Sequence, residues 1–401
     1  MTKVLFPHRG KPLSDNNTKS KLLTQLQALR ALAFVCVFIC HTAIFNNSLE
    51  CVGRWGVSVF FVLSGFVMVY SYYEKNRIKD CNFISNLKFS YAKLNRLWLL
   101  HILCTLVMML FWFVGDKTEI LWKEVLKFIL NAIWIQEWIP FDQRSANPVS
   151  WFLCTIVLGY FIFPWFLQIL EKGYSRRKAL IAILLCLFAE IVVAYIGTLF
   201  PTQQKNVDSL ILDPDLTSWL VYHFPLARIF DIIIGFNLGY LFVKRASNFS
   251  YMKTNLWELI GVVLAVLGNY YFSALAPRLE VGDNIVMSRP EQSWSYSLGF
   301  VFSSIILVYS FAMQNGFISR LLTNNFSMYL AKISPYGFLI HYVIFRYAMA
   351  VYYRIPGFEP GEFLIKYGCW LNLTVGFILT IVCCEIWMRL YARFFNAKKA
   401  N

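Results

Sequence analysis

Two ionisable residues in the first apolar segment, Arg30 and His41, are the strongest candidates for chemistry in this chain of 401 residues. On an α-helix their spacing corresponds to a rotation of ~1100°, about three turns plus 20°, so both side chains lie on one face, ~16 Å apart along the axis. Ionisable groups inside a membrane are costly and mark functional sites. A guanidinium binds anions and an imidazole accepts a proton near neutral pH. The structural alternatives are that Arg30 snorkels to the inner surface and that His41 is hydrogen-bonded within the helix bundle.

Six further ionisable groups fall within apolar segments, namely Glu190, Arg228, Asp231, His341, Arg346 and Glu385. Arg228 and Asp231 are three residues apart on one segment and are close enough to pair, which favours a structural ion pair. His341 lies in the middle of an apolar segment. It is a candidate for chemistry, but it could equally be a histidine that only packs in the bundle. Glu190 has no evident partner in the sequence, and we assign it no role.

The elements that must position these residues are membrane helices. The chain is 58% hydrophobic, with a mean hydropathy of +0.54, and a soluble domain of this length would expose large apolar patches. The apolar residues form runs of about 20, the length that crosses a hydrocarbon core. We therefore predict an all-α polytopic membrane protein that crosses the bilayer about ten times, at residues 24–46, 57–73, 97–114, 149–169, 179–200, 224–243, 256–275, 295–313, 335–353 and 369–391.

The distribution of Lys and Arg predicts the orientation of these segments. If both termini are placed in the cytoplasm, most Lys and Arg residues fall in cytoplasmic loops, as in known membrane proteins. We therefore predict that both termini are cytoplasmic. The formal charge of +15 is therefore mainly an orientation signal, and it requires no nucleic-acid partner. The ten cysteines show neither a disulfide framework nor a zinc-ligand spacing, so we expect no metal.

One membrane domain accounts for nearly the whole chain. We expect a cytoplasmic segment at 1–23, the membrane domain at 24–391 and a cytoplasmic tail at 392–401. Polar residues between 119 and 135 recur at a helical spacing, which predicts an amphipathic helix lying in the membrane interface. Two other outer loops, 201–222 and 276–293, carry acidic, amide and aromatic residues and are candidates for the entrance of a polar ligand.

Two motifs near the start of the chain resemble a known family. The first runs from Leu29-Arg30-Ala31-Leu32-Ala33 to Cys40-His41. The second comprises Gly53-Arg54-Trp55-Gly56-Val57 followed by Phe60-Phe61-Val62-Leu63-Ser64-Gly65-Phe66. In this order and spacing they resemble the membrane-bound acyltransferase family 3, bacterial proteins that O-acylate surface and secreted glycans.

Further matches follow in the order of that family and extend the resemblance over residues 24–391. They are the basic stretch Phe89–His101, the tryptophan motif Pro148–Leu153, the stretch Pro225–Asp231 followed by Gly235 and Gly239, and the stretch Ser334–His341. This chain departs from the family pattern at three positions. Lys93 replaces the first arginine of an Arg-x-x-Arg pair, and Ile156 and Asp231 replace glutamates.

The resemblance implies an acyl-CoA donor, most often acetyl-CoA, and a glycan hydroxyl as acceptor, which predicts a polysaccharide O-acetyltransferase of the bacterial cytoplasmic (inner) membrane. We expect His41 to act as a base or as a transient acyl carrier, assisted by Arg30. Arg30, Lys93, Arg96, Ser64 and Gly65 are expected on the donor side. The residues expected on the acceptor side or in support of it are Arg228, Asp231, Trp151 and His341.

Each assignment has a structural alternative. The basic residues of the inner loops also follow from topology alone. Ser64 and Gly65 also suit close packing of the second helix against the first. Outer aromatics such as Trp138, Trp219, Tyr222 and Trp294 could stack on sugars or form an interfacial belt. At the level of function, the alternatives are a transporter or flippase without group transfer and an acyltransferase with a non-glycan acceptor.

Overall fold

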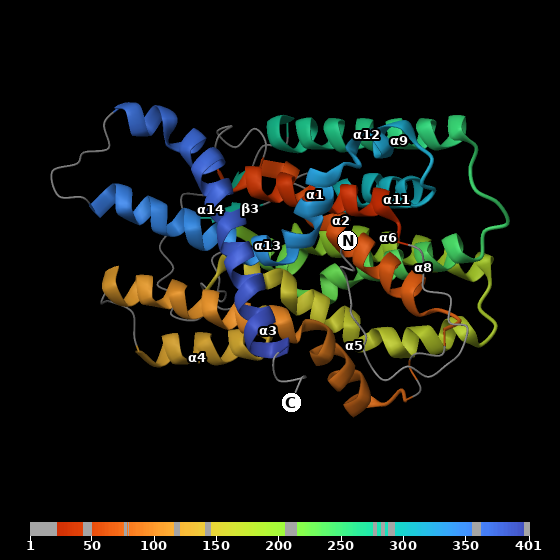
Figure 1. The fold of residues 1–401 in the computed structure, drawn as a ribbon, viewed down its shortest axis with the longest axis horizontal. Coiled ribbons are helices and arrows are strands. Elements are labelled where there is room, and N and C mark those ends of the chain that lie inside the picture. The colour runs from red at the N-terminus through yellow and green to blue at the C-terminus, as the bar shows by residue number, and fades with distance from the viewer. Residues whose placement is uncertain are drawn as a thin grey trace.

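The computed structural model describes residues 22–42, 50–75, 78, 80–115, 121–140, 146–204, 215–275, 279–281, 285–287, 293–354 and 362–396. Most of the predicted cytoplasmic segment 1–23 and the last five residues of the tail lie outside this part of the chain. The described chain folds into a bundle of long helices, joined by short helical turns and one small sheet (Figure 1).

Ten long helices coincide with the ten apolar segments predicted from the sequence. They are α1 (Thr24–Cys40), α2 (Glu50–Tyr72), α3 (Phe83–Gly115), α5 (Trp151–Glu171), α6 (Arg176–Gly197), α8 (Pro225–Val243), α9 (Tyr251–Tyr270), α11 (Leu298–Ala312), α13 (Asn325–Arg354) and α14 (Glu362–Asn396). The shorter elements are α4 (Leu121–Ala132), α7 (Leu216–Ser218), α12 (Phe317–Leu322), the 3₁₀ turn η1 (Pro148–Ser150) and the π turns η2 (Trp219–His223) and η3 (Tyr271–Leu275).

Seven helical segments of the described chain are long and apolar enough to cross a membrane. These segments contain α2, α3, α5, α6, α8, α9 and α14. Helices α1 and α11 are apolar but shorter. The chain is therefore a multi-pass membrane protein, whereas a total of ten crossings and cytoplasmic termini remain predictions.

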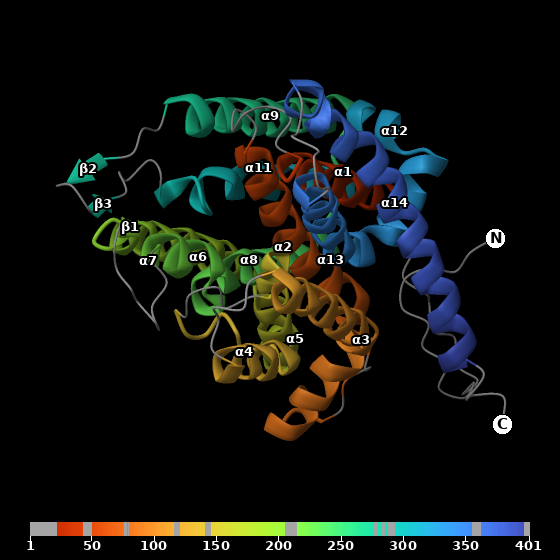
Figure 2. The same cartoon turned by 90° about the vertical axis from the view of Figure 1, so that its left-hand side faces the viewer.

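Helix α2 lies at the centre of the bundle. In its apolar window 72% of the residues are buried, as in α8, against 11% in α9 and 17% in α14. Figure 2 shows the same arrangement, with α2 inside and α9, α14, α6 and α4 around it. The peripheral helices expose large apolar side chains, which suits contact with lipid rather than with water.

Close packing of α2 against α8 depends on two glycines. A Cβ atom at Gly65 would lie 2.1 Å from the Ile232 carbonyl oxygen, and one at Gly235 would lie 2.1 Å from the Val62 carbonyl oxygen. Small residues let helix backbones approach in this way inside membranes. The small-residue contact expected at Gly65 is thus confirmed, but the expected partner was wrong, because the helix it touches is α8 and not α1.

Helix α1 packs on a different part of α2. A Cβ atom at Gly56 would lie 2.6 Å from the Ala33 carbonyl oxygen, and one at Gly53 would lie 2.2 Å from the Cys40 sulfur. Gly53 and Gly56 of the second motif therefore fix the position of α1, and with it the position of His41, against the beginning of α2.

The predicted amphipathic segment forms α4, which packs on α3. Its polar stripe faces the protein: Glu124, Lys127 and Asn131 are buried, and Lys127 and Glu124 form an ion pair of 2.6 Å. The apolar side chains of Trp122 and Ile129 are about half exposed. The apolar face therefore points away from the protein, as expected for a helix in contact with lipid, and its position in the membrane interface remains a prediction.

A three-stranded antiparallel sheet adds to the predicted all-helical fold. Its strands are β1 (Pro201–Gln204), β2 (Leu279–Val281) and β3 (Ile285–Met287), in the order β1-β3-β2. Gln204 pairs with Ile285 and Glu280 pairs with Val286. The sheet joins the two outer loops that the sequence analysis marks as entrance candidates.

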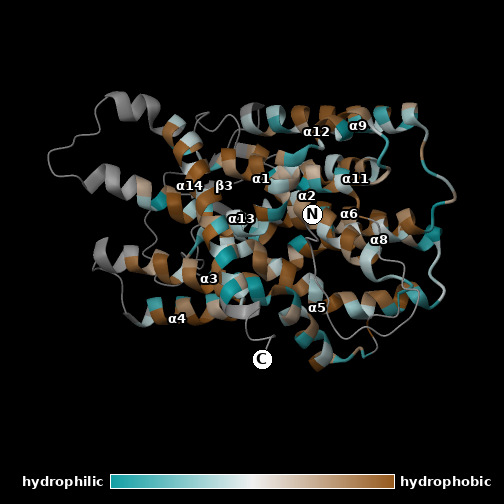
Figure 3. Cartoon of the chain, in the orientation of Figure 1, coloured by the Kyte–Doolittle hydropathy of each residue, from teal (hydrophilic) through white to brown (hydrophobic). Residues whose placement is uncertain are grey.

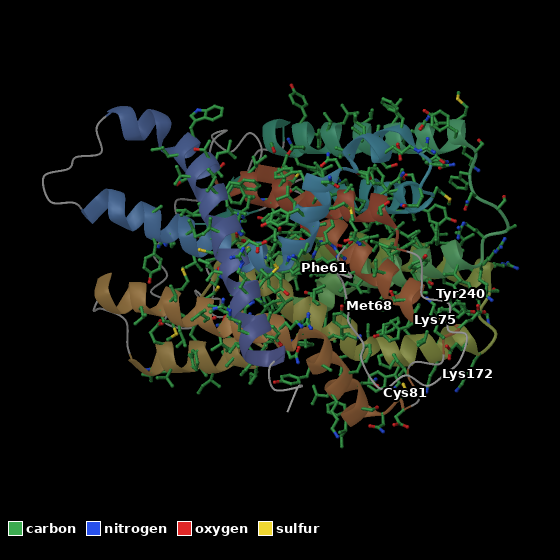
Figure 4. All side chains as sticks on the ribbon, in the orientation of Figure 1. Phe61, Met68, Lys75, Cys81, Lys172 and Tyr240 are labelled. Carbon is green, nitrogen blue, oxygen red and sulfur yellow. The ribbon has the colours of Figure 1, made fainter. Side chains whose placement is uncertain are left out.

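The loops predicted to be cytoplasmic lie at one end of the bundle. Lys75, Cys81 and Lys172 lie toward the right-hand end in Figure 4, where hydrophilic residues also gather in Figure 3. At this end Lys244 forms an ion pair of 2.6 Å with Glu74, which joins the ends of α2 and α8 and raises the pKa of the Lys244 ammonium group. We call this end the basic end.

Candidate active site

His41 and His341, which are 300 residues apart in the sequence, are in direct contact. His41 caps the C-terminus of α1, and His341 lies on α13. The Nε2 atom of His341 is 3.1 Å from the Nδ1 atom of His41. The His41 Nδ1 atom is also 2.8 Å from the Val37 carbonyl oxygen, and the His341 Nδ1 atom is 3.0 Å from the Gly337 carbonyl oxygen. The two rings therefore form a short chain of hydrogen bonds anchored to two helix backbones.

These contacts assign the tautomers of both neutral rings. A carbonyl oxygen only accepts hydrogen bonds, so the Nδ1 atom of each histidine carries the proton. The Nε2 atom of His341 is then unprotonated and accepts a hydrogen bond from the Nδ1–H group of His41. That N–H group therefore has two acceptors, the Val37 carbonyl oxygen and the His341 Nε2 atom. The same assignment leaves the Nε2 atom of His41 unprotonated. Among the described residues nothing hydrogen-bonds this atom, so it is free to act as a base or a nucleophile.

The surroundings of the pair are aromatic. The rings of Phe38, Phe338 and Phe345 lie 5.7–6.2 Å from the ring of His341, which is fully buried. His41 remains partly accessible. Because only the outer member of the pair can be reached, His41 can meet a substrate, whereas His341 can act on it only through His41.

Arg30 lies about three turns before His41 on the same uninterrupted helix, as predicted. Its guanidinium donates to the Gln27 side chain at 3.3 Å, and the Tyr160 hydroxyl of α5 is its electrostatic neighbour. In the described part of the chain no carboxylate lies within ion-pair distance of Arg30. A partly accessible guanidinium without a carboxylate partner is a suitable contact for an anionic ligand.

Lys93 and Arg96 lie on α3, within the half of that helix that begins at the basic end. The Lys93 ammonium lies 4.8 Å from the centre of the Tyr72 ring. Arg96 lies 5.5 Å from the centre of the Tyr391 ring and is an electrostatic neighbour of the Tyr336 hydroxyl. The residue after Tyr336, Gly337, touches Phe34, one turn beyond Arg30 on α1. Helix α13 thus links Arg96 to the level of Arg30.

The other predicted donor residues differ in their environment. Ser64 is partly accessible, whereas Gly65 is covered by the α8 backbone. Gly65 therefore has a packing role, and we do not retain it on the donor side. Ser64 shares a partly accessible stripe of α2 with Phe60 and Val67.

The ion pair predicted between Arg228 and Asp231 of α8 is confirmed. Arg228 and Asp231 are fully buried, and their side chains are 2.8 Å apart. Glu190 of α6, to which sequence analysis assigns no role, lies beside Asp231 and accepts a hydrogen bond from Ser297 at 3.1 Å. This contact could not be predicted, because α6 and α8 meet only in the folded chain.

Trp151 is a buried packing residue of this region. It is only 5% exposed, and its ring lies 4.5 Å from that of Tyr222 and 6.1 Å from that of Phe61. A side chain so deeply buried packs the site and is not a platform for a sugar. Of the outer aromatics that the sequence suggests as sugar contacts, Trp138 and Trp294 are exposed, at 36% and 39%.

Arg54 belongs to the second sequence motif, and its contacts lie on the same side as the α8 ion pair. It hydrogen-bonds Ser295, and its guanidinium lies 4.4 Å from the centre of the Tyr296 ring. The Tyr296 ring in turn lies 5.7 Å from the Tyr222 ring. The Tyr222 hydroxyl is within electrostatic range of Arg54, Arg228 and Cys40, the residue before His41. No local pattern marks Arg54, because its partners are far away in the sequence.

Comparison with known proteins gives a consistent result. The model of a family described as "Acyltransferase domain" matches residues 23–387. A protein named acyltransferase MdmB, from Streptomyces mycarofaciens, is 22% identical over 356 residues, which cover 84% of this chain and 82% of that protein. No solved structure matches the chain. The matched region contains both histidines and all the cations described above.

Proposed function

This chain belongs to the acyltransferase 3 family, and from that premise we propose that it transfers an acyl group, in the first place acetyl, from cytoplasmic acyl-CoA to a hydroxyl group of a surface or lipid-linked glycan. The observation that carries the proposal is the free, unprotonated Nε2 atom of His41, which His341 holds in one tautomer inside the bundle. A hydroxyl is a poor nucleophile and needs such a base.

The reaction follows from this tautomer. The Nε2 atom of His41 takes the hydroxyl proton while the oxygen attacks the thioester carbonyl carbon. The tetrahedral intermediate then expels CoA as a thiolate, which receives the proton from His41. While His41 is an imidazolium, its Nδ1–H group donates to His341 and to Val37, and both acceptors stabilise the positive charge. The bond that forms is the ester, and the bond that breaks is the thioester.

The same nitrogen also suits a two-step route. In that route the Nε2 atom of His41 attacks the thioester, CoA leaves, and the acyl group passes from the imidazole to the acceptor hydroxyl. This route predicts that radiolabel from acetyl-CoA stays on the wild-type protein when no acceptor is present, and that the His41→Ala variant retains no label.

The donor side is assigned to the basic end. Acyl-CoA carries several phosphate charges, and Arg30, Lys93 and Arg96 offer cations between that end and His41. Charge-assisted contacts from arginine to phosphate are strong. Arg30, which has no carboxylate partner among the described residues, is the best candidate for a direct contact.

The acceptor side is assigned to the opposite end, where Tyr296 contacts both Arg54 and Tyr222. Aromatic rings with adjacent hydrogen-bonding groups suit a sugar. The family and the distribution of Lys and Arg together support the bacterial cytoplasmic membrane as the location.

The test is acetyl transfer from radiolabelled acetyl-CoA, added on the cytoplasmic side of membrane vesicles, to the vesicle glycan fraction. His41→Ala should lose at least about a hundredfold in rate, the usual contribution of a general base. His101→Gln is the matched control, because His101 is a buried histidine outside the pair whose one hydrogen-bond partner in the described part of the chain is the Asn131 carbonyl of α4. Equal labelling by His41→Ala and wild type would reject His41 as the base.

The same assay separates the alternatives of acceptor and function. Label that appears in a non-glycan fraction and still depends on His41 would keep the acyltransferase and change the acceptor. A folded wild type that transfers no label from several acyl-CoA donors would favour transport without group transfer.

A further inference from the structure

A buried cluster of three charged groups lies outside the histidine pair. Glu190 is 3% exposed, and Arg228 and Asp231 are fully buried. Arg228 and Asp231 form an ion pair of 2.8 Å. One oxygen of Glu190 accepts from the Ser297 hydroxyl, and Arg228 donates to the Tyr296 carbonyl at 3.3 Å. The other titratable neighbours are Cys186 of α6 and Tyr222, whose ring centre lies 5.6 Å from the Arg228 guanidinium. The cluster thus contains one cation and two carboxyl groups.

The two carboxyl groups lie within hydrogen-bond range of each other. Oε1 of Glu190 and Oδ1 of Asp231 are buried, and no donor among the described residues reaches either atom. Two ionised carboxylates cannot bond each other, because both only accept. A single proton between them gives each oxygen a partner and leaves one negative charge to match Arg228. Since Asp231 is the ion-pair partner of Arg228, the proton belongs on Glu190.

The cluster also holds the segment that carries Arg54. Ser297 is bound to Glu190, and the Tyr296 backbone is bound to Arg228. In the same segment Ser295 hydrogen-bonds Arg54, and the Tyr296 ring supports its guanidinium. A change at Glu190 is therefore transmitted through residues 295–297 to the face of the site opposite the basic end.

We propose that Glu190 is a neutral carboxylic acid that shares one proton with Asp231, and that it is a positioning residue for the acceptor side of the site. The first part stands on the burial and contacts of the cluster, whereas the second rests on the proposed function. The two parts are tested separately.

Infrared difference spectroscopy tests the shared proton. The purified wild type should show the carbonyl band of a protonated carboxylic acid. Both Glu190→Gln and Asp231→Asn should abolish it, because Arg228 keeps the one remaining carboxyl group ionised. Absence of the band from the wild type, or its persistence in both variants, would overturn the shared proton.

Thermal unfolding gives a second, independent test. Each single amide variant keeps one negative charge beside Arg228, so its Tm should remain close to that of the wild type. The double variant leaves the buried guanidinium uncompensated and should unfold at a temperature lower by on the order of 10 °C. A double variant as stable as the singles would overturn the charge assignment. If the double variant cannot be purified, the infrared result on the single variants still decides.

Kinetics test the positioning role with the vesicle glycan as acceptor probe. Glu190→Leu cannot bond Ser297 or Asp231, and its maximal labelling rate per folded protein should fall about tenfold. The KM for acetyl-CoA should not change, and Glu190→Gln should restore most of the rate. An equal loss in both variants, or a raised KM for acetyl-CoA, would reject the positioning role. An inactive wild type would reject the proposed function and leave the infrared test of the shared proton intact.

Discussion

Replacement of His341 by phenylalanine tests whether His341 orients the base His41, because it removes the orienting side chain and leaves the base in place. The new ring would occupy a pocket already formed by Phe38, Phe338 and Phe345. It removes the nitrogen acceptor for the His41 Nδ1–H group and leaves the Cys40 sulfur, 3.5 Å away, as a weak side-chain acceptor. The Gly337 carbonyl loses a side-chain donor but remains within a helix. The exchange places a larger apolar ring where a polar ring was, and a small-to-large change in a packed core typically costs about 1–3 kcal/mol, so the variant should fold with reduced stability.

The expected rate follows from the hydrogen bond that is lost. A hydrogen bond to a charged group contributes about 1.5–3 kcal/mol. The Val37 carbonyl remains 2.8 Å from the His41 Nδ1 atom and retains part of this stabilisation, so we take the lower value. Since each 1.36 kcal/mol corresponds to a factor of ten in rate, His341→Phe should lower kcat about tenfold. His41→Ala, which removes the base, should lose about 10²–10⁴-fold.

Initial rates at saturating acetyl-CoA, normalised to folded protein, measure this difference. His341→Gln serves as the conservative control, because its amide oxygen can accept from the His41 Nδ1–H group and should recover part of the rate. A wild-type rate for His341→Phe would refute the orienting role. A loss as large as that of His41→Ala would also refute it, because His341 would then take part in the proton transfer itself.

Two further substitutions test the donor side and the packing. Arg30→Gln should raise the KM for acetyl-CoA about ten- to a hundredfold, the worth of a charge-assisted hydrogen bond; an unchanged KM in steady-state kinetics would exclude a contact with the donor. Gly235→Ala places a Cβ atom 2.1 Å from the Val62 carbonyl oxygen and should destabilise the fold by about 1–3 kcal/mol. The matched change Gly268→Ala, where the nearest atom is 3.3 Å away, should leave the melting temperature nearly unchanged, and equal effects would contradict the packing argument.

Sequence patterns predicted the positions of the long helices but not all their ends. Helix α3 begins at Phe83 and not near residue 97, and α13 begins at Asn325 although Pro335 lies inside it. The charged and polar residues in these stretches mark the edge of the hydrocarbon core. They do not end a helix, because backbone hydrogen bonds continue into the polar region. The small sheet was not predicted, because its strands are only three or four residues long.

The candidate site was predictable where its contacts are local. The ion pair of Arg228 and Asp231 follows from a spacing of three residues on a helix, and it is present. The contact between His41 and His341 depends on how α1 and α13 pack. Patterns of spacing do not encode contacts between distant helices. They therefore identified both histidines as candidates without indicating that the two rings touch.

The most direct test of the account is the comparison of wild type and His41→Ala in acetyl transfer from radiolabelled acetyl-CoA to the vesicle glycan fraction, at equal levels of folded protein. The account predicts label in the glycan with the wild type and at least about a hundredfold less with the variant. Equal labelling by both proteins would contradict the central claim that His41 carries the chemistry.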